Sequence, residues 1–591
     1  MLYKYVNNIS KYKEKKMTDY KKEYERWLNS QFVDEETKSE LMAIKDDEEE
    51  IKERFYRDLE FGTAGLRGII AAGTNRMNIY TVRRATQGLA MYVKASGKEA
   101  IEKGVAIAYD SRLYSDKFAF EAASVLAANG IKAYVFDELR PTPELSFAVR
   151  HLGCFAGIII TASHNPAIYN GYKVYGEDGA QMAPIDADKV LSYINETDVL
   201  SGAKTVEESD LITVIGEEVD KVYLQNVVAQ AISVDAVKEA ADSFNVIYTP
   251  LHGAGNKLVR RVLDMIGFKN VHVVKEQELP DPKFSTVKSP NPENPEVFVY
   301  AQSLAREKGA NLIIGTDPDS DRVGIMVLNN EGEFVPFTGN QVGALLVEYI
   351  LSRRAENKTL PADPVVIKTI VTTNLAADIC RNYGFEIRNV LTGFKFIGEI
   401  IKNLESKGEE NRYILGFEES YGYLAGTYAR DKDAVVATML IAEMAAYYKT
   451  KGLTLFDCME NIYKKYGYYK ENQKAITLEG ISGVEKIKEI CSFLRENPFK
   501  EICGHKVIEI CDYQTSECVD ISHNKKTAID LPKSNVLSYA NDDNTKVIVR
   551  PSGTEPKIKF YFFVKGIDED DANNKLIKVN EEILSKINEL L

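Results

Sequence analysis

The sequence predicts an α/β protein with three similar βαβ-type domains, whose sheets are mixed but mostly parallel, followed by a smaller α+β domain. Short apolar runs alternate with helical stretches after residue 60, as in chains that build parallel sheets. The alternation comes in three sets, and a polar loop directly follows the last apolar run of each set. Beyond about residue 456 the pattern changes to two strand-like runs around one loop, and then a closing helix.

Chain length also requires several domains, because 591 residues are too many for a single hydrophobic core. We predict domain I over 17–205, domain II over 206–325, domain III over 326–455 and domain IV over 456–591. Residues 17–60 are charged, carry scattered apolar positions and are predicted to be helical. The first 16 residues are basic and lack the apolar core of a signal peptide, so they are either a disordered tail or precede a true start at Met17.

Each of the first three domains is predicted to contain three strands. In domain I these are 105–109, 133–136 and 157–160, with a helix over 118–129. In domain II they are 245–248, 271–274 and 311–314, and in domain III 365–370, 386–390 and 413–415. Domain IV is predicted to hold strands 546–549 and 558–564 in an antiparallel sheet, and a helix near 570–591.

The composition excludes several classes of protein. With 74 basic and 88 acidic side chains the net charge is −14, which argues against nucleic-acid or membrane-surface binding, since both need a basic face. No apolar run approaches the roughly 20 residues that span a bilayer, so a cytoplasmic location is expected. Seven cysteines without a CxxC pair predict free thiols in a reducing compartment, and the histidines show no zinc-ligand spacing with them.

The polar loops of the three sets occupy equivalent places. Ser163, Asp317 and Glu418 each lie three residues beyond the last apolar run of their set. Open α/β sheets bind ligands just beyond the carboxyl ends of their strands. We therefore expect each domain to present one polar loop from the same structural position.

The loop of the second set, GTDPDSDR, predicts a metal site. Asp317, Asp319 and Asp321 alternate along it and can converge on one cation if the loop curls. Oxygen-only ligands favour a hard ion, and a phosphate substrate favours Mg²⁺ over Ca²⁺. An EF-hand is excluded, because Arg322 and Leu328 stand where its loop needs glycine and glutamate.

The loop of the first set, TASHNP over 161–166, combines a hydroxyl, an imidazole and an amide on one tight turn. Ser163 needs an activating group to act as a nucleophile, and the adjacent His164 need not face it, so a hydrolase dyad does not follow. From this segment alone a functional loop and an ordinary turn are both possible. The same letters recur at 522–524 without the flanking residues, and there we predict a plain loop.

Two further segments are suited to anions. FGTAGLRG over 61–68 offers three glycines and Arg67, although such a pattern also serves ordinary turns. RPSGTEPK over 550–557 is a stronger candidate for phosphate, because it gathers cations, hydroxyls and bare backbone in Arg550, Ser552, Gly553, Thr554 and Lys557.

The loop of the third set, GFEES over 416–420, is suited to sugar hydroxyls rather than to phosphate. Glu418, Glu419 and Ser420 supply adjacent carboxylates and a hydroxyl. TGFK over 392–395 and RDKD over 430–433 flank it and add cations that would mean little in isolation.

Taken together and in this order, the five motifs resemble those of the α-D-phosphohexomutase family, over roughly residues 55–565. The wording FGTAGLRG, YNGYKVY and GFEESYGY is most similar to the longer phosphoglucomutase- and phosphopentomutase-like branch. The resemblance implies four domains around a central cleft. It also implies an intramolecular phosphotransferase that interconverts sugar 1-phosphates and 6-phosphates, with glucose phosphate expected and mannose or pentose phosphate as alternatives.

The resemblance also implies roles for individual residues. Ser163 would carry a phosphate, bridged by Mg²⁺ to Asp317, Asp319 and Asp321, and would form a sugar 1,6-bisphosphate intermediate. The residues implied in proton transfer are Arg67, His164 and Lys173. Shorter relatives have a further proton-transfer histidine where this chain has Gly422 and Tyr423. In longer relatives the lysine of RDKD can fill that role, which makes Lys432 the fourth candidate. The implied substrate-binding residues are Arg322, Thr392, Gly393, Lys395, Glu418, Glu419, Ser420 and Arg430, and the implied second phosphate site is Arg550, Ser552, Gly553, Thr554 and Lys557.

Two rival functions remain. A phosphatase with Asp317 as nucleophile would leave Ser163 and the 550–557 loop unexplained. A sugar-phosphate-binding regulator without catalysis is the other, although Ser163, Arg67 and the three aspartates are all present.

Overall fold

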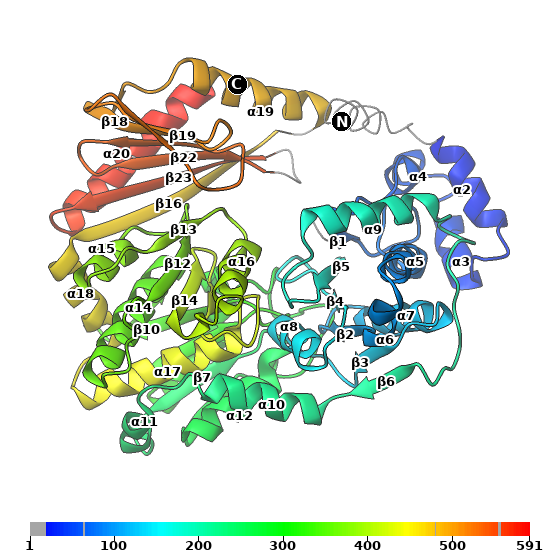
Figure 1. The fold of residues 1–591 in the computed structure, drawn as a ribbon, viewed down its shortest axis with the longest axis horizontal. Helices are drawn as coiled ribbons and strands as arrows, with labels where there is room; N and C mark the ends of the chain where they lie inside the picture. The colour runs from blue at the N-terminus through cyan, green and yellow to red at the C-terminus, as the bar shows by residue number, and fades with distance from the viewer. Residues whose placement is uncertain (1–18, 63–64, 479, 553–556) are drawn as a thin grey trace.

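The computed structural model describes residues 19–62, 65–478, 480–552 and 557–591, and these form four domains, each built on one β-sheet (Figure 1). The domains follow one another in an arc, from domain I on the right of Figure 1 through domains II and III to domain IV at the upper left. Within the described residues, no helix has both the length and the apolar character needed to cross a membrane.

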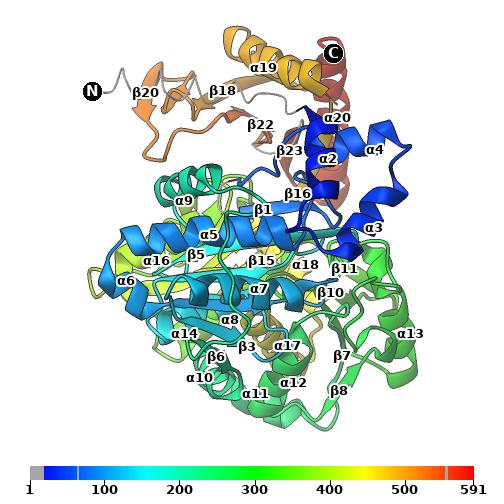
Figure 2. The same cartoon turned by 90° about the vertical axis from the view of Figure 1, so that its right-hand side faces the viewer.

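Residues 19–60, which were predicted to be helical, form three short helices. They are α2 (Tyr20–Asn29), α3 (Glu35–Ala43) and α4 (Glu48–Phe55). The side chain of an aspartate caps the first turn of each helix, so each cap marks a separate helix start. Trp27 is fully buried and meets the rings of Phe55 and Tyr80, which packs these helices beside α5 (Ile79–Ala95) (Figure 2).

Domain I has a six-stranded sheet. Its strand order is β1 (Gly65–Ile69), β5 (Tyr169–Gly176), β4 (Ala156–Ile160), β2 (Val105–Tyr109), β3 (Ala133–Phe136) and β6 (Ile212–Ile215). Its other helices are α6 (Lys98–Lys103), α7 (Ser115–Ala128), α8 (Thr142–His151) and α9 (Pro184–Glu196). The residues of β2 and β4 are all buried, which explains why these strands are continuous apolar runs in the sequence.

Domains II and III have smaller sheets. The order in domain II is β11 (Phe334–Phe337), β10 (Val323–Leu328), β9 (Leu312–Thr316), β7 (Asn245–Thr249) and β8 (Asn270–Val273). In domain III it is β13 (Arg388–Val390), β12 (Val365–Thr369), β14 (Tyr413–Glu418) and β15 (Gly422–Leu424). The helices are α10 (Glu217–Val228), α11 (Val234–Ala240), α12 (Gly255–Ile266) and α13 (Val299–Lys308), then α14 (Gly339–Glu356), α15 (Leu375–Asn382), α16 (Phe394–Glu405), α17 (Ala434–Thr450) and α18 (Leu455–Tyr466).

The three α/β domains share one arrangement around their polar loops. The strands β4, β9 and β14 each pair in parallel with one neighbour, respectively β2, β7 and β12. On the other side each pairs antiparallel with the strand that follows it, respectively β5, β10 and β15. The polar segments that follow the three sets therefore lie where a parallel strand turns into its antiparallel return strand, although Gly416–Glu418 of the third segment still belong to β14.

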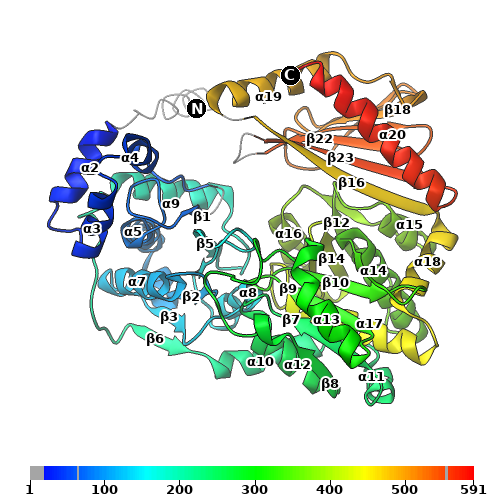
Figure 3. The ribbon, with the colours of Figure 1, turned by 180° about the vertical axis from the view of Figure 1, so that it is seen from behind.

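Domain IV is an antiparallel sheet, as expected. Its order is β16 (Tyr468–Thr477), β23 (Lys557–Gly566), β22 (Lys546–Pro551), β21 (Leu537–Asn541), β18 (His505–Asp512), β19 (Glu517–Asp520) and β20 (Lys525–Ala528), with β17 (Glu501–Ile502) paired to β18. It carries α19 (Gly480–Glu496) and α20 (Glu569–Asn588), and Figure 3 shows α20 lying along the sheet. The segment 522–524 is the turn between β19 and β20, where the His523 ring bonds Asp520.

The sheets place three boundaries later than predicted. β6 pairs with β3, so the sheet of domain I continues past residue 205. β11 pairs with β10, so the sheet of domain II continues past residue 325. α18 packs against α14 and α15, so it belongs to domain III although it follows residue 455. These differences arise because the edge strand β6 is short and partly exposed, and because strand pairing is not visible in a local pattern.

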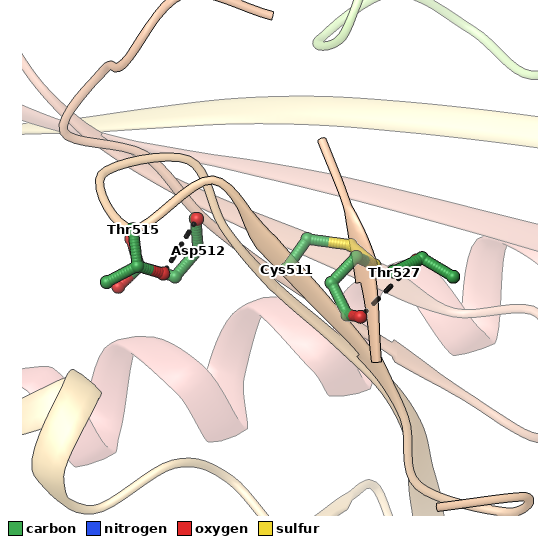
Figure 4. The surroundings of a disulfide bond; sticks show 5 residues. Cys511, Asp512, Thr515 and Thr527 are labelled. Atoms are coloured by element: carbon green, nitrogen blue, oxygen red, sulfur yellow. Dashed lines mark hydrogen bonds between the residues drawn. A yellow bond between two sulfur atoms is a disulfide. The ribbon is translucent and has the colours of Figure 1, made fainter. Parts of the chain in front are cut away.

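The cysteines correct one prediction. Cys511 and Cys518 form a disulfide between β18 and β19, where they are directly opposite in register (Figure 4). Residues opposite one another in an antiparallel pair have neighbouring Cβ atoms, a proximity that their sequence separation of seven does not reveal. The other five cysteines are free thiols, as expected.

Candidate active site

The turn between β4 and β5 presents the Ser163 hydroxyl. Ser163 is 4% exposed and adopts a left-handed backbone conformation with a φ of 50°. Its backbone N–H donates to Thr161 Oγ1 at 2.7 Å, and its Oγ donates to Asp317 Oδ2 at 2.9 Å. The turn therefore directs the hydroxyl of domain I onto the acidic loop of domain II.

A buried arginine holds this turn in shape, and no motif in the sequence marks it as part of the site. The guanidinium of Arg112 donates to the backbone carbonyls of Ser163, Asn165, Pro166 and Tyr169. Its Nε lies 3.4 Å from Asp110 Oδ2, and both side chains are fully buried. Four fixed carbonyls explain how a serine is kept in a backbone conformation that costs free energy.

The three aspartates converge as predicted. One oxygen from each of Asp317, Asp319 and Asp321 lies within 4.8 Å of the other two, and all three side chains are buried. Oδ1 of Asp319 and Oδ1 of Asp321 have no hydrogen-bond partner within the described residues. Burial and the two neighbouring carboxylates raise the pKa of Asp317. Three buried carboxylates whose oxygens lie this close together fit a divalent hard cation such as Mg²⁺.

Two lysines from other domains meet the acidic loop. Lys173 Nζ lies 3.1 Å from Asp319 Oδ2, and Lys432 Nζ lies 3.0 Å from Asp321 Oδ2. Burial alone would raise the pKa of Asp319, but Lys173 and a hydrogen bond from Thr142 hold it below its usual value. Burial opposes the charge on Lys432, yet Asp321, Asp431 and Glu418 raise its pKa. Lys432 therefore stays charged beside the carboxylates.

His164 and Arg67 lie at the same turn. His164 Nδ1 is 3.1 Å from Ser163 Oγ, so the two side chains do face each other although they are adjacent in sequence. Burial, reinforced by the positive charge of Arg322, lowers the pKa of His164 to about 2, which makes the ring neutral. Arg67 lies on β1 and donates to Asn165 Oδ1 at 3.4 Å. Arg322 itself is ion-paired with Glu293.

The GFEES segment over 416–420, which is the predicted sugar loop, is braced by its own domain. Glu418 is buried and accepts a hydrogen bond from the backbone N–H of Gly393 at 3.0 Å. Glu419 accepts from the hydroxyls of Thr369 and Thr372, and burial together with Glu418 raises its pKa to about 7. The two glutamates are therefore held in different hydrogen-bond environments, one on a backbone amide and one on two hydroxyls.

Lys368 lies behind Glu419 and was not predicted. Its ammonium is buried and donates to the carbonyls of Thr369 and Thr372, the residues that hold Glu419. Burial lowers the pKa of Lys368 to about 7. The unfolded chain keeps this proton to a higher pH, so between pH 7 and the ordinary lysine pKa of 10.5 the unfolded state binds more protons. The free energy of unfolding therefore rises with pH in that window, because the cost of burying the charged ammonium is relieved as Lys368 loses its proton.

We expect Lys368→Met to remove this pH dependence. Relative to the variant, wild-type stability should climb from pH 7 to 9 by at most about 1.4 kcal/mol per pH unit. Urea unfolding at several pH values measures the difference, and Lys578→Met, at an exposed position on α20, is the control. If the free energy of unfolding depends on pH in the same way in wild type and in Lys368→Met, the Lys368 ammonium is not buried as described.

A cavity of about 850 Å³ lies between domains I, III and IV. Thr392, Lys395 and Arg550 line it, and Thr392 Oγ1 is buried without a hydrogen-bond partner within the described residues. Gly393, next to Thr392 in the chain, donates its backbone N–H to Glu418. Lys432 of the same domain reaches Asp321, and Ser163 of domain I reaches Asp317. The cavity therefore brings predicted residues of domains III and IV together, while the three aspartates bring together predicted residues of domains I, II and III.

The 550–557 loop is described in part. Gly553 and Thr554 lie outside the described residues. The backbone N–H of Ser552 donates to the carbonyl of Lys557 at 2.7 Å, which closes the base of the loop. Arg550 Nη1 is 3.5 Å from the hydroxyl of Tyr561, and Arg550 faces the cavity.

Arg430 is placed elsewhere than the sequence suggested. Its guanidinium is ion-paired with Glu405 and donates to the carbonyls of Thr427 and Ala429. Glu405 also binds Arg150 of domain I, so this group links domains I and III. Arg430 is 1% exposed and is used in that contact rather than in the cavity wall.

Comparisons with known proteins find relatives that match most of the chain. Family models described as phosphoglucomutase/phosphomannomutase, alpha/beta/alpha domains I, II and III, match residues 58–200, 221–331 and 338–466. A phosphoglucomutase from Staphylococcus saprophyticus is 39% identical over 529 residues, covering 88% of this chain and 94% of that protein. A phosphoglucomutase from Staphylococcus aureus is 39% identical over 534 residues, covering 89% and 93%.

Solved structures show the same fold. A phosphoglucomutase/phosphomannomutase family protein from Burkholderia thailandensis superposes with a TM-score of 0.60 at 18% identity, covering 87% of this chain and 96% of that one. Parafusin, a phosphoglucomutase from Paramecium, superposes with a TM-score of 0.65 at 18% identity, covering 90% and 96%.

Proposed function

Since the chain belongs to the phosphoglucomutase/phosphomannomutase family and is a phosphosugar mutase, we propose that it interconverts α-D-glucose 1-phosphate and glucose 6-phosphate through a phosphoserine at position 163. The observation that carries the proposal is the Ser163 hydroxyl, held 2.9 Å from Asp317 where three polar loops meet. The identity with the two staphylococcal phosphoglucomutases supports glucose as the sugar.

The acidic loop would hold Mg²⁺ through Asp317, Asp319 and Asp321, with a phosphate on Ser163 as a further ligand. A bound Mg²⁺ supplies positive charge that offsets the charge developing on the transferred phosphoryl group. Lys173 and Lys432 add fixed positive charge on either side. Phosphoryl transfer needs alignment and charge neutralisation more than covalent help, and these residues provide both.

In the forward reaction a sugar hydroxyl takes the phosphoryl group from Ser163. A bond forms from the sugar oxygen to phosphorus while the bond from phosphorus to Ser163 Oγ breaks, giving a sugar 1,6-bisphosphate. Reorientation of this intermediate lets its other phosphate return to Ser163. In the first transfer the attacking sugar hydroxyl loses its proton, and the departing Ser163 Oγ takes up a proton that His164, with Nδ1 beside Oγ, can deliver. In the return transfer the Ser163 hydroxyl loses its proton as it attacks, and His164 can accept it once a phosphate dianion raises the basicity of its ring.

The rest of the substrate would be bound by domains III and IV. Glu418, Glu419 and Ser420 would bind the sugar hydroxyls, with Thr392, Gly393 and Lys395 beside them. Arg322 would bind the substrate beside the metal loop. The phosphate that is not reacting would lie at Arg550, Ser552 and Lys557, together with Gly553 and Thr554 of the same loop. Enclosure between the domains would keep water from hydrolysing the phosphoserine.

We expect kcat/KM with glucose 1-phosphate to exceed that with mannose 1-phosphate or ribose 1-phosphate by about tenfold or more. A coupled assay of each isomerisation measures this, with a trace of the sugar bisphosphate as primer. Preference for mannose or ribose 1-phosphate would assign a phosphomannomutase or a phosphopentomutase instead.

The same preparation separates the mutase from its two rivals. Intact mass and peptide mass spectrometry should find an acid-stable phosphate on Ser163. A labile phosphate on Asp317 would indicate a phosphatase, and binding of sugar phosphate without isomerisation or phosphorylation would indicate a non-catalytic protein.

A further inference from the structure

One glycine next to the sugar loop has no backbone reason to be a glycine. Gly422 begins β15 and is opposite Glu418 in the antiparallel register with β14. It is not among the glycines with a positive φ, so any L-residue could adopt its backbone conformation. Glycine in a strand costs conformational entropy and often marks a place where another group comes close.

The group that comes close is the side chain of Lys432. A Cβ at position 422 would lie 2.2 Å from Lys432 Cδ, 2.7 Å from Cγ and 3.4 Å from Cβ. The first two distances are far below van der Waals contact, and they involve the middle of the stem rather than its free end. Side chains opposite each other on an antiparallel pair stand on the same face, so the Lys432 stem fills the space beside Glu418 that a residue 422 side chain would take.

Other contacts fix where the stem ends. The Lys432 ammonium lies 3.0 Å from Asp321 Oδ2 and 3.1 Å from Asp431 Oδ1. It also stands 5.7 Å from the centre of the Phe394 ring, on the helix that follows Gly393. The side chain of Lys432 is 14% exposed. The stem therefore passes directly over Gly422 before its charge reaches the acidic loop.

We propose that Gly422 is a positioning residue for the mutase reaction: the absence of a side chain there lets Lys432 cross β15 and place its ammonium between the metal loop and the sugar loop. Position 422 acts only through Lys432 and touches neither sugar nor phosphate. The effect on catalysis rests on the proposed function, whereas the effect on the position of Lys432 does not.

The test combines kinetics with a measurement independent of activity. We expect Gly422→Ala to lower kcat by about tenfold or more and Lys432→Met by about 100-fold, with KM for the sugar phosphate changed less than about threefold. In the double variant kcat should fall to the Lys432→Met value and no further, because the alanine acts through a side chain already removed. In Gly422→Ala, acetic anhydride should label Lys432 faster than in wild type, as peptide mass spectrometry can quantify.

The control is a glycine of the same domain with an equal steric restriction. A Cβ at Gly343 would lie 2.2 Å from the Phe417 ring, so Gly343→Ala should lower the melting temperature without changing Lys432 labelling. Losses of kcat that multiply in the double variant, or unchanged labelling of Lys432 in Gly422→Ala, would overturn the proposal. A wild-type protein without mutase activity would instead refute the proposed function, and the labelling result would still decide the position of Lys432.

Discussion

Replacement of Ser163 by alanine should lower kcat by a factor of about 10⁴ or more and leave the melting temperature nearly unchanged. The substitution removes one oxygen, the atom that would carry the phosphoryl group, from a turn whose shape depends on other residues. Arg112 holds the carbonyl of Ser163, and Thr161 holds its N–H, so the backbone does not depend on the hydroxyl. The coupled isomerisation assay and thermal unfolding measure the two effects.

The chain supplies a matched control for this variant. Ser522 is followed by the same two residues as Ser163, but it lies in the turn between β19 and β20 of domain IV. We expect Ser522→Ala to keep full activity and to leave the protein phosphorylated. Residual mutase activity in Ser163→Ala above about one part in 10³ would mean that phosphoryl transfer does not pass through this oxygen.

Asp317→Asn should have opposite effects on activity and on stability. We expect kcat to fall by about 10²- to 10³-fold, because the amide removes a ligand and a negative charge from the metal site. Without metal, the same change should raise the free energy of unfolding by about 1 kcal/mol, since Asp317 is a buried carboxyl whose pKa is raised by burial and two neighbouring carboxylates. An asparagine oxygen can still accept the N–H groups of Asp321 and Arg322.

Thermal unfolding with and without Mg²⁺ measures the second effect. Mg²⁺ should raise the melting temperature of wild type, because it binds the folded state only, and should have little effect on Asp317→Asn. Asp235→Asn is the control, since the Asp235 side chain is fully exposed. An Asp317→Asn variant that Mg²⁺ stabilises as much as wild type would exclude this carboxylate from the metal site.

The strands that are buried on both faces could be predicted from the local sequence pattern alone. The predicted runs near 105–109, 157–160 and 365–370 became β2, β4 and β12, whose residues are all buried, because burial on both faces produces a continuous apolar run. The positions of Ser163, Asp317 and Glu418 followed in the same way from the buried runs that became β4, β9 and β14, at whose carboxyl ends these residues lie. The return strands β5, β10 and β15 were not predicted, because they depend on pairing with strands already named and lack so distinct a pattern.

The candidate site shows the same division between local and distant information. Residues with unusual chemistry in a short loop, such as the three aspartates, could be found from the sequence. Residues that act over long separations could not: Arg112 reaches Ser163 across 51 positions, and Thr142 reaches Asp319 across 177. Arg430 was predicted to bind substrate because it belongs to the RDKD motif. Only the position of Glu405 shows that its guanidinium is used between domains I and III instead.

One structural unit, a strand followed by a turn and an antiparallel return strand, occurs three times in the chain, at β4 and β5, at β9 and β10, and at β14 and β15. Each of the three copies has different polar residues at its turn. In the proposed mechanism the first copy would carry the nucleophile, the second negative charge for a cation, and the third hydrogen-bonding groups for an uncharged ring. On that proposal, altered residues in the third copy would change the sugar preference and leave the phosphorylation chemistry of the other two in place.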